Sequence, residues 1–234
     1  MKYKSIFISD VHIGSSHCNV DKLLTFLKDN EFENIFLVGD IIDGWLLRSR
    51  WKWTQYDNLF IQKILRQKRH GVNVIYLWGN HDDFLQHFNG FDFGGIPILR
   101  EYIYHSFGRR YLLVHGDQFD GAVRFCPRLQ KLGSVVYEMA MFISFLLRLC
   151  GVRWSLSKFL KSKAKSAVQF LASYQEIVAE YAKAKQVNGV ICGHIHTPDM
   201  RDFGDIQYYN IGDMVESNTV LVESVDGQLQ LISL

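Results

Sequence analysis

Five of the nine histidines follow short apolar runs, and each has Asp, Asn or Gly close beside it. Short apolar runs bounded by Gly, Asn or Asp are typical of buried strands. In open α/β sheets, ligand sites lie at the carboxyl ends of the strands. The pattern therefore predicts a layered fold that gathers several polar loops at one edge of a sheet. The five residues are His12, His81, His115, His194 and His196.

Strand-like and helix-like segments alternate over the first 117 residues. The spacing of apolar residues predicts helices over 20–30 and 56–70, with Leu59 and Leu65 among the inward-facing residues of the second. The segments predicted as strands are 4–9, 34–38, 72–78, 111–114, 189–192, 206–210, 219–224 and 228–232. This alternation indicates an α/β or mixed (α+β) layered domain.

Residues 120–185 differ from the rest of the chain in pattern and in charge. They show helical spacing over 124–149 and 155–185, and they carry 11 Lys and Arg against 4 Asp and Glu, a net charge of +7. The remaining residues carry 15 against 20, a net charge of −5. Because strands resume afterwards, we expect one core formed by 1–119 and 186–234, with a helical insertion at 120–185. The overall charge of only +2 argues against a nucleic-acid-binding protein, whereas the basic insertion favours an anionic partner.

The segment 135–147 is strongly apolar but shorter than the ~20 residues needed to span a bilayer. It is predicted to be a buried helix or, alternatively, a wall for acyl chains or a helix that dips into a membrane surface. The four cysteines form no C-x-x-C pair, and the first apolar run is too short for a signal peptide. The expected location is the cytoplasm, with the cytoplasmic face of the inner membrane as an alternative. The oligomeric state is left open.

Asp10, Asp40 and Asn80 also follow apolar runs, so carboxylate and amide oxygens join the histidines. This donor set suits manganese, iron, zinc or magnesium better than copper(I) or an iron–sulfur cluster. The D-V-H run at 10–12 and the H-I-H run at 194–196 each offer two ligands one residue apart, and Asp40 at a strand end can bridge two ions. Each run alone occurs often by chance, but together they predict a two-metal site.

The same residues resemble the sequence blocks of the calcineurin-like metallophosphoesterase superfamily. The blocks are D-V-H (10–12), G-D-I-I-D (39–43), G-N-H-D (79–82), V-H-G-D (114–117) and G-H-I-H (193–196), in the family's order. The resemblance implies a four-layer αββα sandwich with two divalent metal ions, manganese first and magnesium, iron(II) or zinc as alternatives. It implies one ion held by Asp10, His12, Asp40 and His196, and the other by Asp40, Asn80, His115 and His194.

The resemblance also assigns roles beside the metal ligands. His81 would protonate the leaving oxygen or stabilise charge on the phosphorus oxygens, and Asp82 would orient the His81 ring. Asp43 and Asp117 resemble carboxylates that hold ligand imidazoles in place. Capping of a loop is an equally good interpretation of these two carboxylates.

Within the superfamily, the chain looks most like the bacterial UDP-2,3-diacylglucosamine pyrophosphatases of lipid A biosynthesis. In both, the H-G-D block leads into a basic, aromatic helical insertion that returns to G-H-x-H. This implies that the insertion caps the site and that the substrate is a lipid-linked nucleotide sugar, cleaved to UMP and 2,3-diacylglucosamine 1-phosphate. The candidate substrate contacts in the insertion are Arg124, Arg128, Lys158, Lys161 and Lys165. A solvated helix face is the alternative interpretation of the lysines.

The third block departs from that branch at one residue. The lipid A enzymes tend to have Arg where this chain has His81. Arg holds a phosphate in a bidentate manner, whereas His can act as an acid. The alternative is therefore a related phosphodiesterase or phosphatase acting on another nucleotide, nucleotide sugar or lipid phosphate. A non-catalytic binding scaffold is disfavoured because no ligand of the blocks is missing.

Overall fold

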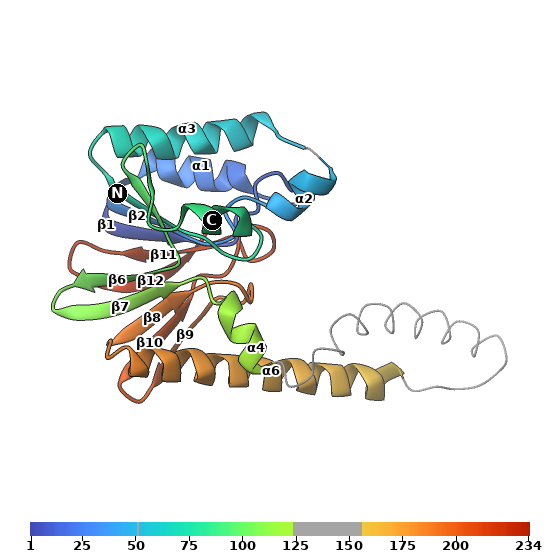
Figure 1. Cartoon of the computed structure of the whole chain (residues 1–234). Helices are drawn as coiled ribbons and strands as arrows, with labels where there is room; N and C mark the ends of the chain where they lie inside the picture. The colour runs from blue at the N-terminus through green and yellow to red at the C-terminus, as the bar shows by residue number, and fades with distance from the viewer. Residues whose placement is uncertain (51, 124–155) are drawn as a thin grey trace. The chain divides into compact units, whose positions relative to one another are not determined.

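The structure is a computed structural model that describes residues 1–50, 52–123 and 156–234 (Figure 1). It divides into two compact units, one formed by Met1–Asp117 with Val178–Leu234 and the other by Gln118–Ile177. The predicted helix over 124–149 and the apolar segment 135–147 lie outside the described residues. The cap role of the insertion therefore stays a prediction. Among the described helices, none has both the length and the apolar character needed to cross a membrane.

Two sheets form the core of the first unit. The seven-stranded sheet has the order β12-β11-β1-β2-β3-β5-β4, and β1, β2, β3 and β5 run parallel. Its strands are β1 (Lys2–Ile8), β2 (Glu31–Val38), β3 (Asn73–Leu77), β4 (Asp92–Phe93), β5 (Ile96–Leu99), β11 (Thr219–Glu223) and β12 (Leu229–Ser233). The five-stranded sheet has the order β6-β7-β8-β10-β9, with β7, β8 and β10 parallel. Its strands are β6 (Glu101–Ser106), β7 (Arg109–Val114), β8 (Gly189–Cys192), β9 (Asp199–Phe203) and β10 (Ile206–Asn210).

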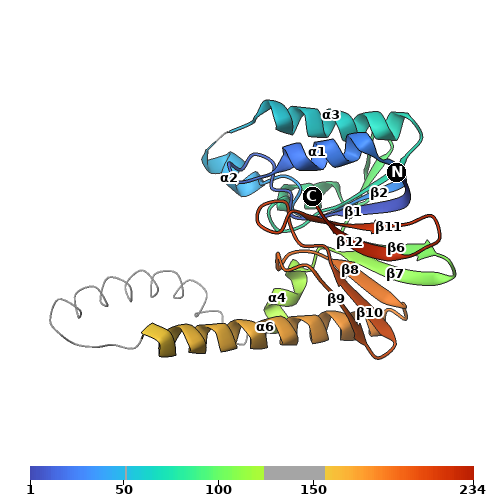
Figure 2. The same cartoon turned by 180° about the vertical axis from the view of Figure 1, so that it is seen from behind.

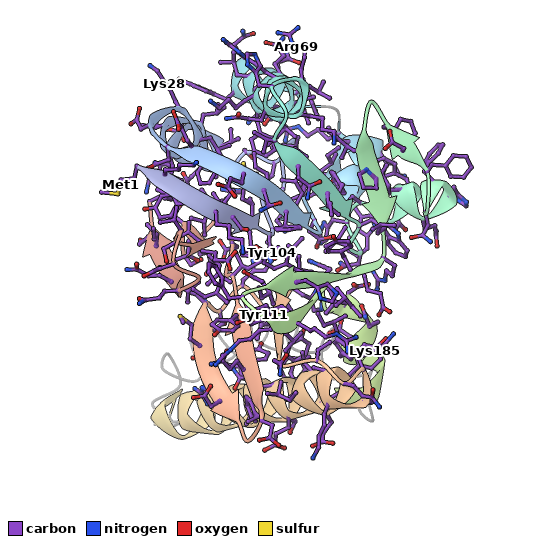
Figure 3. The ribbon with its side chains drawn as sticks, turned by 90° about the vertical axis from the view of Figure 1, so that its left-hand side faces the viewer. Met1, Lys28, Arg69, Tyr104, Tyr111 and Lys185 are labelled. Carbon is purple, nitrogen blue, oxygen red and sulfur yellow. The ribbon has the colours of Figure 1, made fainter. Side chains whose placement is uncertain are left out.

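The central strands are apolar on both faces because each face is covered. Successive side chains of a strand point to opposite faces of the sheet. Accordingly, Ile35 and Leu37 of β2 join the core beneath the helices, whereas Phe36 joins the core between the two sheets. Phe36 stacks on Phe7 of β1 with ring centroids 5.0 Å apart. Figure 3 shows Tyr104 of β6 between the sheets, where its ring lies 4.9 Å from that of Phe36.

Two helices, α1 (Val20–Asp29) and α3 (Gln55–Arg69), lie side by side on the outer face of the seven-stranded sheet (Figures 1 and 2). Phe60 and Ile64 of α3 are buried, but Leu59 is 39% and Leu65 50% exposed, so their predicted inward orientation is wrong. Neighbouring residues lie about 100° apart around a helix, so only one residue of each apolar pair faces the sheet.

A helix covers the second sheet of the first unit. The last turns of α6 (Leu156–Ala184), from Val178 onward, belong to this unit. Val178 and Ala182 are fully buried, and the hydroxyl of Tyr181 donates to Glu101 at the start of β6 over 2.9 Å. The layers therefore follow the order helix, sheet, sheet, helix (Figure 1), which is the αββα arrangement implied by the resemblance. The described part of the second unit contains α4 (Asp120–Val123) and the first part of α6.

Several elements have no counterpart among the predicted segments. They are α2 (Gly44–Ser49), the 3₁₀ helices η1 (Asp83–Phe88) and η2 (Asp117–Phe119), and the strands β4, β5, β6 and β9. The strands β4, β6 and β9 lie at sheet edges, and β9 is largely exposed and polar. An edge strand needs little apolar patterning because it packs on fewer neighbours.

Candidate metal centre

The predicted ligands stand just past the carboxyl ends of five strands. Asp10 follows β1, Asp40 follows β2, Asn80 follows β3, His115 follows β7 and His194 follows β8. Two of the groups capable of holding a cation are Asp10 with His12 and His196, and Asp40 with His115 and His194. In each group, the ligand atoms lie within 4.8 Å of one another. The fold thus gathers residues that are far apart in the sequence.

The backbone at these residues adopts a conformation that L-amino acids disfavour. Among the described residues, eight non-glycine residues have positive φ, and five of them are predicted ligands. These five are Asp10 (φ 50°), His12 (53°), Asp40 (53°), His194 (71°) and His196 (52°). Each left-handed residue costs about 1–3 kcal/mol, and such strain tends to cluster at functional sites. The fold therefore holds these side chains in directions that the ordinary backbone conformation would not give.

In the first group, both histidines face the Asp10 carboxylate. Its Oδ1 atom lies 3.2 Å from Nε2 of His196 and 3.8 Å from Nε2 of His12. Its Oδ2 atom accepts hydrogen bonds from the Ser9 hydroxyl and from the backbone N–H of His194, the latter over 2.9 Å. One oxygen is therefore fixed by the protein, while the other faces two imidazoles.

In the second group, Asp40 and His115 lie in contact. Oδ2 of Asp40 is 3.1 Å from Nε2 of His115, and Oδ1 accepts from the backbone N–H of His81 over 2.7 Å. The Nδ1 atom of His115 lies 3.1 Å from the carbonyl oxygen of Val38. Donation from Nδ1 to this carbonyl leaves the lone pair of a neutral ring on Nε2, as ligation of a metal requires.

Four buried polar atoms of the predicted ligands form no hydrogen bond in the described structure. Buried polar atoms without a partner are rare in folded proteins, and each calls for a ligand, ion or water. These four atoms come from the loops after β1, β3 and β7 and are all oxygens or imidazole nitrogens, the donors that hard and borderline cations accept. The residues therefore fit divalent cations. The atoms are Asp10 Oδ1, His12 Nε2, Asn80 Oδ1 and His115 Nε2.

The electrostatics of the site favour cations. Burial alone lowers the pKa of His115, but the charges of Asp40 and Asp10 raise it to about 10. Burial likewise lowers the pKa of His12, and Asp10 and Asp43 raise it to about 10. Burial raises the pKa of Asp10, yet His115, His12 and His196 bring it well below its usual range. The carboxylates thus stabilise positive charge at the site. In the metal-free protein this charge is that of the protonated imidazoles.

Asp43, in the loop after β2, and Trp45, in α2, both contact the His81 ring. Its Nδ1 atom lies 3.1 Å from Oδ1 of Asp43, and its ring centroid lies 4.2 Å from that of Trp45. Asp43 also caps α2 by accepting from the N–H of Leu46 over 2.9 Å. Both interpretations of Asp43, imidazole partner and cap, therefore apply. Trp45 was not expected from the sequence, where a single Trp after a GDIID run carries no distinctive signal.

Asp82 does not orient His81, so that expectation is wrong. The Asp82 carboxylate is fully buried and accepts from the hydroxyl of Tyr76 over 2.6 Å and from the N–H of Ile41 over 3.0 Å. It also accepts from the N–H groups of Asp40 and Gly79. Burial and the charge of Asp40 raise its pKa. Asp82 thus joins the loops after β2 and β3. Its described hydrogen bonds do not include the His81 ring.

Asp117 pairs with a residue other than a predicted ligand. Both of its oxygens lie 2.8 Å from NH2 of Arg100, whose guanidinium lies 4.1 Å from the centre of the Trp78 ring. The carboxylate also contributes to the raised pKa of His115. Asp117 therefore acts on the ligands through its charge, and its described hydrogen bond goes to Arg100, not to an imidazole.

Two glycines let the loops approach one another closely. A Cβ atom at Gly79 would collide with Oδ1 of Asp40 and with the His115 ring. A Cβ atom at Gly193 would collide with the hydroxyl of Ser9 and with the carboxylate of Asp10. The glycines of the G-N-H-D and G-H-I-H blocks are thus required by space.

The candidate substrate contacts stay predictions. Arg124 and Arg128 lie outside the described residues. Lys158, Lys161 and Lys165 fall on the backbone of α6, and their side chains lie outside the described ones.

Layers of this order, with oxygen and imidazole donors gathered at the strand ends, are those of a metal-dependent phosphoesterase. The sequence model of the calcineurin-like phosphoesterase family matches residues 3–198, so the chain belongs to that family and is a hydrolase. The family uses divalent metal ions, and the metal-binding groups described above agree with this.

Relatives with a named activity are 22–30% identical to this chain. The chain is 30% identical to a UDP-2,3-diacylglucosamine hydrolase of Neisseria gonorrhoeae over 145 residues, covering 55% of this chain and 58% of that enzyme. It is 22% identical to the enzyme of the same name from Photorhabdus laumondii over 202 residues, covering 83% and 82% of the two chains. A hypothetical protein from Pyrococcus horikoshii superposes with a TM-score of 0.56 at 11% identity, covering 100% of this chain and 88% of that one, which shows the fold alone.

Proposed function

We propose that this phosphoesterase hydrolyses UDP-2,3-diacylglucosamine to UMP and 2,3-diacylglucosamine 1-phosphate. The support is the name shared by the relatives, at 22–30% identity. A substrate with two acyl chains resides in a membrane, so we place the reaction at the cytoplasmic face of the inner membrane. The basic insertion, with a net charge of +7, is suited to an anionic surface or a diphosphate.

The observation that carries the hydrolytic chemistry is the convergence of buried donor atoms without hydrogen-bond partners, on Asp10, His12, Asn80 and His115. We propose that two divalent cations, manganese first, are held by these residues together with Asp40, His194 and His196. Such a pair of cations makes a water nucleophilic near neutral pH and neutralises charge on the phosphoryl oxygens.

The proposed reaction consumes one water. The water oxygen forms a bond to the α-phosphorus, the bond from that phosphorus to the bridging oxygen breaks, and the bridging oxygen leaves on the sugar 1-phosphate. Asp43 holds the Nδ1 side of His81, so Nε2 is the atom available to substrate. His81 would donate a proton or a hydrogen bond from this atom to a phosphate oxygen.

The test is release of UMP from UDP-2,3-diacylglucosamine in mild detergent by the manganese-loaded protein. EDTA and His81→Ala samples serve as controls. The proposal predicts release that is abolished by EDTA and strongly reduced by the substitution. No release, from a sample that still hydrolyses a chromogenic phosphodiester, would refute the substrate and retain the two-metal hydrolase.

His81 favours a second candidate, a related phosphoesterase with a different substrate. A sugar phosphate leaves easily without protonation, whereas an alkoxide leaving group benefits from an acid. A His in place of Arg therefore suits a phosphodiester or phosphomonoester. Comparing kcat/KM for UDP-2,3-diacylglucosamine with values for nucleotides, simple nucleotide sugars and lipid phosphates under one set of conditions separates the two candidates.

A further inference from the structure

A groove runs between α1 and α3 on the outer face of the seven-stranded sheet, among residues that the metal centre does not use. Its volume is about 650 Å³. Pockets for small ligands have volumes of about 300–1,000 Å³. The strands that precede the two helices are parallel, so the helices run in the same direction and their C-terminal ends lie together. Figure 3 shows Lys28 and Arg69 projecting outward at these ends.

The middle of the groove is apolar. Leu24 of α1 and Leu59 of α3 line it, and Tyr56 adds an aromatic ring one turn before Leu59. Leu59 and Tyr56 are 39% and 54% exposed. This exposed apolar surface can cover the apolar part of a ligand.

The end of the groove at the helix C-termini is basic. Lys28, Lys63 and Arg66 line it, and among the described residues none of the three lies within 4.0 Å of an acidic group as an ion pair. Burial, Arg66 and Lys28 lower the pKa of Lys63, so the three cations lie close enough to repel one another. The acidic group that lines the groove is Asp21, seven residues from Lys28 and about 10 Å away along the helix.

A helix dipole accounts for only part of this cluster. Cations in the last turn of a helix interact favourably with its C-terminus, and Lys28, Arg66, Lys68 and Arg69 lie in such turns. Lys63 lies six residues before the end of α3, outside the range of that effect. An unpaired Lys placed against two other cations stabilises the free protein in no evident way, so a bound anion is the simplest partner for it.

We propose that this groove binds a small anionic amphiphile. A phosphate or carboxylate head lies among Lys28, Lys63 and Arg66, and an apolar chain lies over Leu24, Leu59 and Tyr56. Asp21, about 10 Å from Lys28 along α1, repels the head and so sets the direction of the ligand. The proposal concerns a second site and does not depend on the substrate of the metal centre.

The test is a calorimetric titration of the full, manganese-loaded chain with dodecyl phosphate below its micelle concentration. The variants are Lys63→Gln in the groove and Lys22→Gln, a matched control that removes a lysine of α1 outside the groove. Because the metal centre is unchanged in all three proteins, a difference between them reports the groove. We expect one ligand per groove and a Kd at least about 10-fold higher in Lys63→Gln, with Lys22→Gln like the wild type. Equal affinity in the two variants would overturn the proposal.

Further measurements test whether the apolar part of the groove contributes to binding, whether Lys63 has only a structural role, and whether the ligand binds at the metal centre instead. Inorganic phosphate should bind far more weakly than dodecyl phosphate, and equal affinities would refute the apolar part of the site. Without ligand, Lys63→Gln should raise Tm because it removes repulsion, whereas a structural Lys63 would make this substitution lower Tm. Loss of dodecyl phosphate binding on treatment with EDTA would assign the binding to the metal centre and overturn the proposal.

Discussion

Nδ1 of His81 lies 3.1 Å from Oδ1 of Asp43, although the two residues belong to loops after different strands. Asp43 is buried and caps α2, so its carboxylate is held in place from the other side as well. The pair leaves Nε2 of His81 as the atom available to substrate. Trp45, on the first turn of α2, lies against the same ring.

Replacing Asp43 by Asn should weaken catalysis without removing the cap of α2, because Asn is also a good N-cap residue. Loss of a carboxylate that orients an imidazole typically costs about 10- to 100-fold in activity. We expect kcat to fall by this amount, with a changed pH profile and little change in Tm. The matched control is Asp83→Asn, a more exposed carboxylate 3.8 Å from Arg48. Equal effects of the two substitutions would contradict the account.

Replacing His81 by Ala should affect substrates according to their leaving groups. An acid matters most where the leaving oxygen is strongly basic, and general acid catalysis contributes about 10²- to 10⁴-fold. We expect a large loss of kcat/KM for an alkyl phosphodiester and a much smaller loss for a p-nitrophenyl diester. Metal content should stay that of the wild type, because His81 is not a predicted ligand. A uniform loss of kcat/KM for both esters would exclude protonation of the leaving oxygen and assign His81 to stabilisation of charge on the phosphorus oxygens.

Gly193→Ala should prevent the metal centre from forming. The added Cβ atom would collide with Ser9 and with the Asp10 carboxylate, so the loop carrying His194 and His196 must move away. We expect metal binding and activity to be lost together, as measured by elemental analysis and hydrolysis of a chromogenic diester. Gly121→Ala is the control, because a Cβ atom there meets none of the described atoms within 4 Å. Normal metal content in Gly193→Ala would contradict the geometry.

Metal affinity should rise with pH. In the metal-free protein the pKa values of His12 and His115 are raised to about 10, so both rings are protonated at pH 7. A metal ion must displace these protons, and affinity should increase between about pH 6 and about pH 9. Calorimetry in two buffers of different ionisation enthalpy measures the number of protons released. Affinity that does not change with pH, and release of no protons, would be inconsistent with the predicted ligands.

The sequence pattern predicts the central part of the fold well. Strands β8 and β10 match the predicted 189–192 and 206–210, because apolar and aromatic residues predominate in both and are buried. Edge strands such as β9 could not be recognised, since a half-exposed strand can tolerate Asp, Arg and Met. The ligand blocks were visible because each directly follows a buried strand. Contacts that depend on tertiary approach, such as Trp45 on His81, leave no local pattern.

The roles of Asp82 and Asp43 show the same limit. Asp82 is adjacent to His81 in sequence, but its described hydrogen bonds go to Tyr76 and to backbone N–H groups. Asp43 is 38 residues away and contacts the ring. Sequence proximity therefore selected the wrong carboxylate, because successive residues of a tight loop can point in different directions.

The central claim is a site for two metal ions with Asp40 between them. The most direct measurement is the manganese content of the reconstituted protein and of Asp40→Asn, with circular dichroism to confirm that both are folded. The account predicts two ions per chain in the wild type and at most one, with loss of hydrolysis, in Asp40→Asn. A folded wild-type protein that binds no manganese or other divalent ion, or a variant that retains two, would contradict it.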